Sequence, residues 1–191
     1  GMLVRKAELT QGEDVLIHAA GSGVSVAAIQ LAKLLGARRI FVTASSPEKL
    51  SRAKALGATH LINYRQEDFL EVVRRETGKR GVDVVVDHVG PDTIAKSLSC
   101  LTKGGRLVTC GSTSGGEATI NLRQVFFKSL SILGSTMGPR SDLERAWGLF
   151  CDRKIAPVIA QVFPIREIGW AHTFLESRGA FGKVVLDMKK W

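Results

Sequence analysis

Short apolar runs alternate along the chain with longer segments in which apolar residues recur every three or four positions. The runs predict buried parallel strands, because both faces of such strands are covered. We expect six of them, at Val15–Ile17, Arg39–Ala44, His60–Tyr64, Val82–Asp87, Arg106–Cys110 and Ser131–Gly134. The segments between them are typical of amphipathic helices, which we expect at Val24–Leu35, Pro47–Leu56, Glu67–Thr77 and Thr93–Leu101. This alternation predicts an α/β fold with a doubly wound, six-stranded parallel sheet.

Helix boundaries agree with this interpretation. Ser46 precedes Pro47, the favoured arrangement at a helix start, and Gly36 and Gly57 each follow a predicted helix end. The segment Ser141–Glu144 has the spacing of a capping box, which predicts a further helix start at Ser141.

The pattern changes after residue 152, where Pro157 and Pro164 interrupt the chain. Only one helix, Ile168–Glu176, and one last strand, Lys183–Met188, are predicted there. We therefore expect a main domain at residues 1–152 and a short C-terminal appendage at residues 153–191.

The turn after the first strand carries the clearest chemical signal. Gly21, Ser22, Gly23, Val24 and Ser25 lie between a buried strand and a helix start. Small residues let a backbone approach a pyrophosphate, and the positive end of the helix dipole favours the phosphate charge. Val26 stands where the G-x-G-x-x-G pattern has its third glycine. The alternative is a plain strand-to-helix turn without a ligand.

Composition narrows the classes of function. The chain has 191 residues, 45% of them apolar, with no stretch long enough to cross a membrane and no signal-peptide core, so we expect a cytoplasmic protein. The net charge is +9, but the basic residues form isolated doublets without interleaved aromatic residues, which favours a small anionic ligand over nucleic acid. The three cysteines and four histidines show no metal-ligand spacing. We expect no bound metal, and reduced cysteines within the core.

Several phrases in this order resemble the cofactor-binding half of the medium-chain dehydrogenase/reductase superfamily, which includes zinc-type alcohol dehydrogenases and quinone oxidoreductases. They are residues 18–30, 53–58, 62–64, 81–90, 104–111 and 182–186. The resemblance implies a Rossmann domain of an oxidoreductase that transfers hydride to or from a carbonyl, an alcohol or a conjugated alkene, including an enoyl reductase. The family usually has Gly-Gly-Val-Gly in the turn, where this chain has Ser22-Gly23-Val24-Ser25.

The same resemblance implies a preceding, mostly β domain that carries much of the substrate pocket and, in zinc-dependent members, the metal ligands. We expect that domain to lie outside this sequence and residues 153–191 to complete it. The chain alone is then expected to bind nucleotide with little turnover. A rival hypothesis is a non-catalytic module that senses NADP(H) or assembles with a partner.

The end of the second strand favours NADP over NAD. An NAD site typically has a carboxylate there, whereas this strand ends in Thr43-Ala44-Ser45-Ser46 and is followed by Lys49 and Arg52. Hydroxyls and cations suit a 2′-phosphate. By resemblance, Lys49 and Tyr64 occupy positions that bind this phosphate in NADP-using quinone oxidoreductases. The alternatives are a helix N-cap role for Ser46 and a solvated side chain for Lys49.

The remaining site residues also follow from the resemblance, which places them along the ribose and the nicotinamide. They are Val89, Gly90, Cys110, Gly111, Leu133, Gly134 and Ser135. His88 is either a ligand contact or a hydrogen-bonded structural residue. No residue is predicted as a general acid, and the only tyrosine, Tyr64, lacks a lysine four positions later. The family also implies a homodimer that pairs through the edge strand at residues 131–135.

Overall fold

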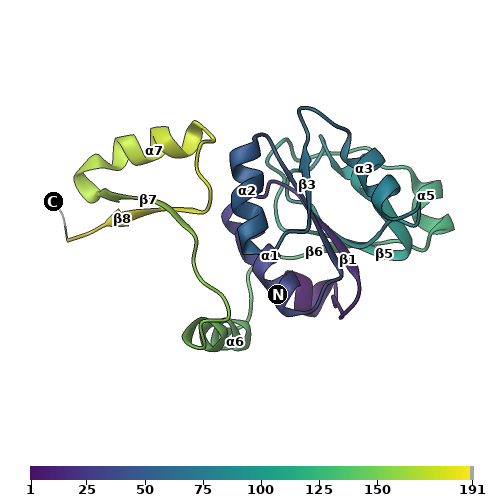
Figure 1. The fold of residues 1–191 in the computed structure, drawn as a ribbon, viewed down its shortest axis with the longest axis horizontal. Coiled ribbons are helices and arrows are strands. Elements are labelled where there is room, and N and C mark those ends of the chain that lie inside the picture. The colour runs from purple at the N-terminus through teal and green to yellow at the C-terminus, as the bar shows by residue number, and fades with distance from the viewer. Residues whose placement is uncertain (190–191) are drawn as a thin grey trace.

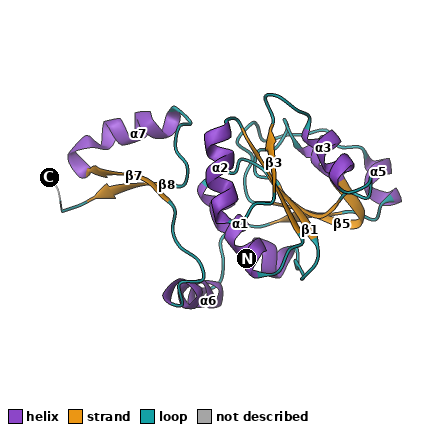
Figure 2. Ribbon diagram, in the orientation of Figure 1, coloured by secondary structure: helices purple, strands orange, loops and turns teal. Residues whose placement is uncertain are grey.

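The computed structural model describes residues 1–189 and contains a six-stranded parallel sheet with strand order β3-β2-β1-β4-β5-β6. This order confirms the predicted doubly wound fold (Figure 1, Figure 2). The strands are β1 (Asp14–Ile17), β2 (Arg39–Ala44), β3 (His60–Asn63), β4 (Val82–Val86), β5 (Leu101–Thr109) and β6 (Ser131–Gly134).

Helices cover both faces of the sheet because alternate strand residues point to opposite sides. Val15 and Ile17 pack with apolar residues of α1 (Gly23–Leu34) and α2 (Pro47–Leu56). Leu16, between them, packs on the other face with α3 (Phe69–Glu76) and α4 (Ile94–Cys100). The sheet therefore lies between two buried apolar layers, as the uninterrupted apolar strands predict.

The strand register brings the carboxyl ends of the strands to one edge. Ile17 at the end of β1 pairs with Val42 of β2 and Val86 of β4, and Thr109 at the end of β5 pairs with Gly134 of β6. Loops that follow these strands therefore lie along the same side of the sheet. We call this side the carboxyl edge, and it is where open α/β sheets bind ligands.

Several boundaries differ from the sequence prediction. β5 begins at Leu101 rather than Arg106, because the chain turns directly from α4 into the strand. A short helix, α5 (Leu122–Phe127), lies in a stretch expected to be irregular, with the Asn121 side chain as its N-cap. A helical turn at Met2–Lys6 was also not predicted.

The predicted helix start at Ser141 is wrong. Helix α6 (Arg140–Cys151) begins one residue earlier, after Pro139, and has no side-chain cap. Ser141 therefore lies inside the first turn, and Glu144 forms an ion pair with Arg140 at 2.8 Å instead of capping the helix.

The C-terminal part contains β7 (Ile159–Pro164), the short helix η2 (Ile165–Glu167), α7 (Ile168–Glu176) and β8 (Lys183–Asp187). β7 and β8 form a separate parallel pair, and β7 was not predicted. Figure 1 shows this unit beside the main sheet, with the connection from α7 to β8 next to α2. The division of the chain at residue 152 stays a prediction.

Two of the three cysteines are not in the core. Cys100 is buried, whereas Cys110 follows β5 at the carboxyl edge and Cys151 ends α6, and both are exposed. The expectation of three core thiols is therefore wrong for these two. Within residues 1–189, no helix has the length and apolar character needed to cross a membrane.

Candidate functional site

The turn between β1 and α1 is held by its own serine side chains. Ser22 is the N-cap of α1, and its Oγ accepts the backbone N–H of Ser25 at 3.0 Å. The Ser25 hydroxyl in turn donates to the carbonyl oxygen of His18 at 2.6 Å. Since the first N–H groups of a helix have no partner within the helix, those of Gly23 and Val24 remain available to a ligand. The altered turn thus forms an ordered helix N-terminus, of the kind that favours anions.

The connection between α7 and β8 packs against this turn. The N–H of Gly182 donates to the carbonyl oxygen of Gly21 at 2.8 Å, and the Lys49 ammonium donates to the carbonyl oxygen of Arg178. The Arg52 guanidinium lies 4.5 Å from the ring centroid of Phe181. Residues from opposite ends of the sequence therefore build one surface.

The Lys183 side chain lies against the start of α1. A methyl group added at Gly23 would fall 2.5 Å from the Lys183 Nζ. Among the described residues, Lys183 has no carboxylate within ion-pair distance. A cation beside the positive end of a helix dipole is unfavourable unless an anion joins them. Sequence reasoning missed both Lys183 and Arg178, although the phrase at residues 182–186 was part of the family resemblance.

The predicted 2′-phosphate residues lie at the ends of β2 and β3. Ser46 is the N-cap of α2 and accepts the Lys49 N–H at 3.4 Å, so the N-cap interpretation is confirmed. Ser45 precedes it at the carboxyl edge. Tyr64 follows β3, its N–H donates to the carbonyl oxygen of Ala44, and half of its surface is exposed. Ser45, Ser46 and Lys49, which are neighbours in sequence, thus lie at the same edge of the sheet as Tyr64.

Asp87 organises the loop after β4. Its Oδ1 accepts the N–H groups of Val89 at 3.0 Å and Gly90 at 3.1 Å, and the Thr93 hydroxyl at 2.9 Å. Gly90 has a φ of +98°, and a side chain there would meet Ser112 at 2.8 Å. This glycine is therefore needed for the close approach of the two loops.

An open pocket of about 640 Å³ lies after β5 and β6. Its lining includes Cys110, Gly111, Gly134 and Ser135, four of the residues expected near the nicotinamide. Leu133 does not line it and instead packs partly buried against the core. Two cations from the start of the chain, at Arg5 and Lys6, also line the pocket, and the sequence analysis did not single them out.

Two buried histidines lie beneath the carboxyl edge. His18 Nδ1 is 3.0 Å from Thr43 Oγ1, and its Nε2 is 2.9 Å from Ser97 Oγ. Burial lowers the pKa of His18 to about 4, although the Asp87 carboxylate opposes this shift. Burial also lowers the pKa of His88, whose Nε2 is 3.2 Å from Ser22 Oγ and 3.0 Å from Ser25 Oγ. The hydrogen-bonded alternative for His88 is therefore present in the structure.

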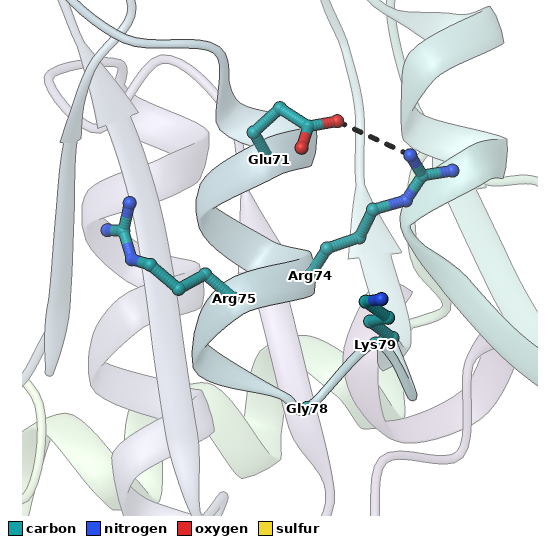
Figure 3. A pocket seen from close by; sticks show the side chains of 5 residues that line it. All are labelled: Glu71, Arg74, Arg75, Gly78 and Lys79. Atoms are coloured by element: carbon teal, nitrogen blue, oxygen red, sulfur yellow. Dashed lines mark hydrogen bonds and ion pairs between the residues drawn. The ribbon is translucent and has the colours of Figure 1, made fainter.

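A second hollow lies away from all the predicted site residues. Figure 3 shows its lining, which is Glu71, Arg74, Arg75, Gly78 and Lys79. These residues lie at the end of α3 and just after it, before the chain enters β4. The hollow is thus at the amino ends of the strands, opposite the carboxyl edge. Two of its three cations are already paired, Arg74 with Glu71 at 3.3 Å and Arg75 with Glu76 at 2.9 Å.

A zinc ion does not fit the residues at hand. In the part of the chain that the structure describes, no three His, Cys, Asp or Glu side chains come close enough together to hold a metal. No step is therefore derived through a metal.

The strand order and the turn at α1 define a doubly wound α/β domain of the Rossmann type. The zinc-binding dehydrogenase family matches residues 23–152. The chain belongs to this family and, with it, to the medium-chain dehydrogenase/reductase superfamily. The resemblance seen in the sequence is therefore confirmed.

Similar proteins match nearly the whole of this chain. A 2-haloacrylate reductase of a Burkholderia species is 38% identical over 185 residues, 92% of this chain and 55% of that protein. Quinone oxidoreductase 1 of Escherichia coli is 35% identical over 196 residues, 96% of this chain and 60% of that protein. The crystal structure of an NAD-dependent alcohol dehydrogenase matches with 47% sequence identity and a TM-score of 0.92. The match covers 98% of this chain and 54% of the dehydrogenase chain. This chain thus spans a little over half the length of these relatives.

Proposed function

We propose that this chain is the cofactor-binding part of an NADP(H)-dependent oxidoreductase that transfers hydride to or from a carbonyl, an alcohol or a conjugated alkene. The cationic surface around the N-terminus of α1 carries the proposal. Lys183 lies against Gly23 without a carboxylate partner in the described chain, and Lys49 lies beside the same turn. These charges suit a pyrophosphate and a further phosphate.

The relatives support the class of reaction and of cofactor. Those named above include reductases and an alcohol dehydrogenase, and the quinone oxidoreductase of Escherichia coli was solved in complex with NADPH with a TM-score of 0.85 to this chain. The alcohol dehydrogenase structure is described as NAD-dependent. The choice between the two cofactors therefore rests on the chain's own residues.

Each part of the carboxyl edge has a task in this proposal. Residues 21–25 would hold the pyrophosphate, and Ser45, Ser46, Lys49 and Tyr64 would surround the 2′-phosphate. Val89 and Gly90 would meet the ribose through the backbone. Cys110, Gly111, Leu133, Gly134 and Ser135 would lie along the nicotinamide. The nicotinamide supplies the hydride chemistry, and the chain binds and orients it.

Calorimetric titration with NADP⁺ and, separately, NAD⁺ tests this proposal. We expect tighter binding of NADP⁺, and we expect Lys49→Ala to weaken NADP⁺ about tenfold, since a charged phosphate contact contributes roughly 1.5 kcal/mol. The substitution should leave NAD⁺ unchanged. Lys54→Ala, at an exposed lysine in the last turn of the same helix, is the matched control.

The outcomes separate the parts of the proposal. Equal affinity for both nucleotides in the unmodified chain would remove the 2′-phosphate argument and leave a nicotinamide nucleotide site. Failure to bind either nucleotide would contradict the proposed function.

We also infer a cytoplasmic location, a homodimer through β6 and a role of residues 153–191 in completing a catalytic domain.

A further inference from the structure

The imidazole of His88 reaches from the end of β4 into the turn that begins α1. Its Nε2 is 3.0 Å from Ser25 Oγ and 3.2 Å from Ser22 Oγ. His88 is 7% exposed and Ser25 is fully buried, so these contacts are shielded from water. Ser22 is the N-cap of the helix. The His88 ring, just after β4, thus contacts Ser22, the residue that caps the first turn of α1.

The hydroxyl protons determine which way these hydrogen bonds run. Ser25 has one hydroxyl proton, which it donates to the carbonyl oxygen of His18 at 2.6 Å. Its oxygen can therefore only accept from His88, because a ring nitrogen lone pair at 3.0 Å would repel it. We assign a proton to His88 Nε2, so that Nδ1 is the ring nitrogen that gains a proton when the imidazole becomes charged.

The surroundings of the ring disfavour its charged form in the absence of a ligand. Burial lowers the pKa of His88, and the Asp87 carboxylate and the carbonyl groups of His88 and His18 oppose this shift only in part. Asp87 is itself occupied by four hydrogen-bond donors of its own loop and α4. From β1 the ring faces the buried, uncharged His18, and from β8 the Lys183 ammonium lies over the same turn. From the loop after β5, the Thr113 N–H donates to the His88 carbonyl oxygen.

We propose that His88 is a positioning residue for the dinucleotide pyrophosphate: it holds the first turn of α1 through Ser22 and Ser25 and takes up a proton from solvent when the anionic ligand binds. This inference rests on the proposed function. A pyrophosphate at the N-terminus of α1 brings negative charge next to Ser22, one hydrogen bond away from the ring. Because the His88 ring is buried, this charge stabilises the imidazolium more than it would in water. Binding should then tighten as the pH falls.

The test is the affinity for NADP⁺ at pH 8 and pH 6, with proton uptake measured by calorimetry in two buffers of different ionisation enthalpy. His88→Gln keeps an N–H donor near Nε2 but cannot become charged. His88→Leu removes the donor. The 2′-phosphate also titrates near pH 6, so the unmodified chain is compared with His88→Gln, in which the ligand's own titration is the same. His172→Gln, at an exposed histidine of α7, is the matched control.

We expect His88→Gln to bind within about threefold of the unmodified chain at pH 8, and to show at least threefold less tightening at pH 6, with less proton uptake. His88→Leu should bind about tenfold more weakly at both pH values, as expected for one lost hydrogen bond to a buried group. If His88→Leu does not fold, His88→Gln still decides. An unchanged pH profile and proton uptake in His88→Gln would overturn the inference while nucleotide binding itself stands. No NADP⁺ binding by the unmodified chain would instead overturn the proposed function, and this inference with it.

Discussion

Individual side chains at the carboxyl edge explain how a turn with serines in two glycine positions still forms an ordered helix start. Ser22 caps the helix and Ser25 anchors to the His18 carbonyl, so both hydroxyls are used inside the turn. The sequence predicted the turn but not the contacts of both serines with His88, which comes from a loop about sixty residues later. A pattern within one segment cannot show which distant side chain will fill the space beside it.

His18 gives a prediction at the same scale. Its pKa is lowered from 6.5 to about 4, first by burial, with Asp87 opposing the shift. The unfolded chain therefore binds a proton at His18 below about pH 6.5, whereas the folded chain does so only near pH 4. The stability from this group is complete above pH 6.5 and is lost as the pH falls. Between pH 7 and pH 5 we expect a loss of about 2 kcal/mol in the free energy of unfolding.

Urea unfolding at the two pH values measures this loss. His18→Gln should be less stable at pH 7, because the contacts with Thr43 and Ser97 change, but should lose much less stability on going to pH 5. His172→Gln, at an exposed position, should behave like the unmodified chain. The same pH dependence in His18→Gln would show that other groups cause it.

At the scale of the elements, prediction succeeded where an element's own residues decide its ends. Ser46 caps α2 before Pro47, and Gly57 adopts a φ of +122° at the end of that helix, as their residue types suggest. It failed where neighbours decide. The capping-box pattern at Ser141 was overridden because α6 starts at Arg140, after the extended Pro139. β5 was expected to begin at Arg106, yet Leu101 already pairs with Val82 of β4.

The edge strand β6 gives a prediction about assembly. β6 is hydrogen-bonded to β5 on one side and ends the sheet on the other, with Ile132 exposed. An open strand edge can pair with a second copy of itself. Ile132→Lys should then weaken a dimer at least tenfold, through desolvation and repulsion of like charges across the two-fold axis. Sedimentation velocity over a range of concentrations measures this change.

Leu175→Lys provides the control, because it places a lysine at an exposed apolar residue of α7 away from β6. It should sediment like the unmodified chain. A monomer at all concentrations in the unmodified chain would contradict the proposed homodimer, and equal weakening by both substitutions would assign the contact to another surface.

At the scale of the whole molecule, the fold follows from the sequence because a parallel sheet covered on both faces requires continuous apolar strands, and these are visible locally. The site is less visible because it is assembled across the chain. The Gly182 N–H donates to the Gly21 carbonyl oxygen, and the Lys49 ammonium donates to the Arg178 carbonyl oxygen. Sequence patterns assigned residues 21–25 and 45–49 to the proposed site, but only the packing of the last strand brings Lys183 to the start of α1.

Lys183→Ala tests whether this long-range arrangement serves the ligand. The Lys183 ammonium lies beside Gly23, where the pyrophosphate shared by NAD⁺ and NADP⁺ would bind. Removing it should weaken both nucleotides by a similar factor, about tenfold for one charged phosphate contact, whereas Lys49→Ala weakens NADP⁺ alone. The free energy of unfolding without nucleotide should stay the same or rise, since an unpaired cation leaves the positive end of the α1 dipole.

Calorimetric titration measures the two affinities, and urea unfolding measures the stability. Lys189→Ala is the control, at an exposed lysine just beyond β8. A loss confined to NADP⁺ would instead move Lys183 to the 2′-phosphate, and unchanged affinity for both nucleotides would mean that the pyrophosphate binds without the last strand.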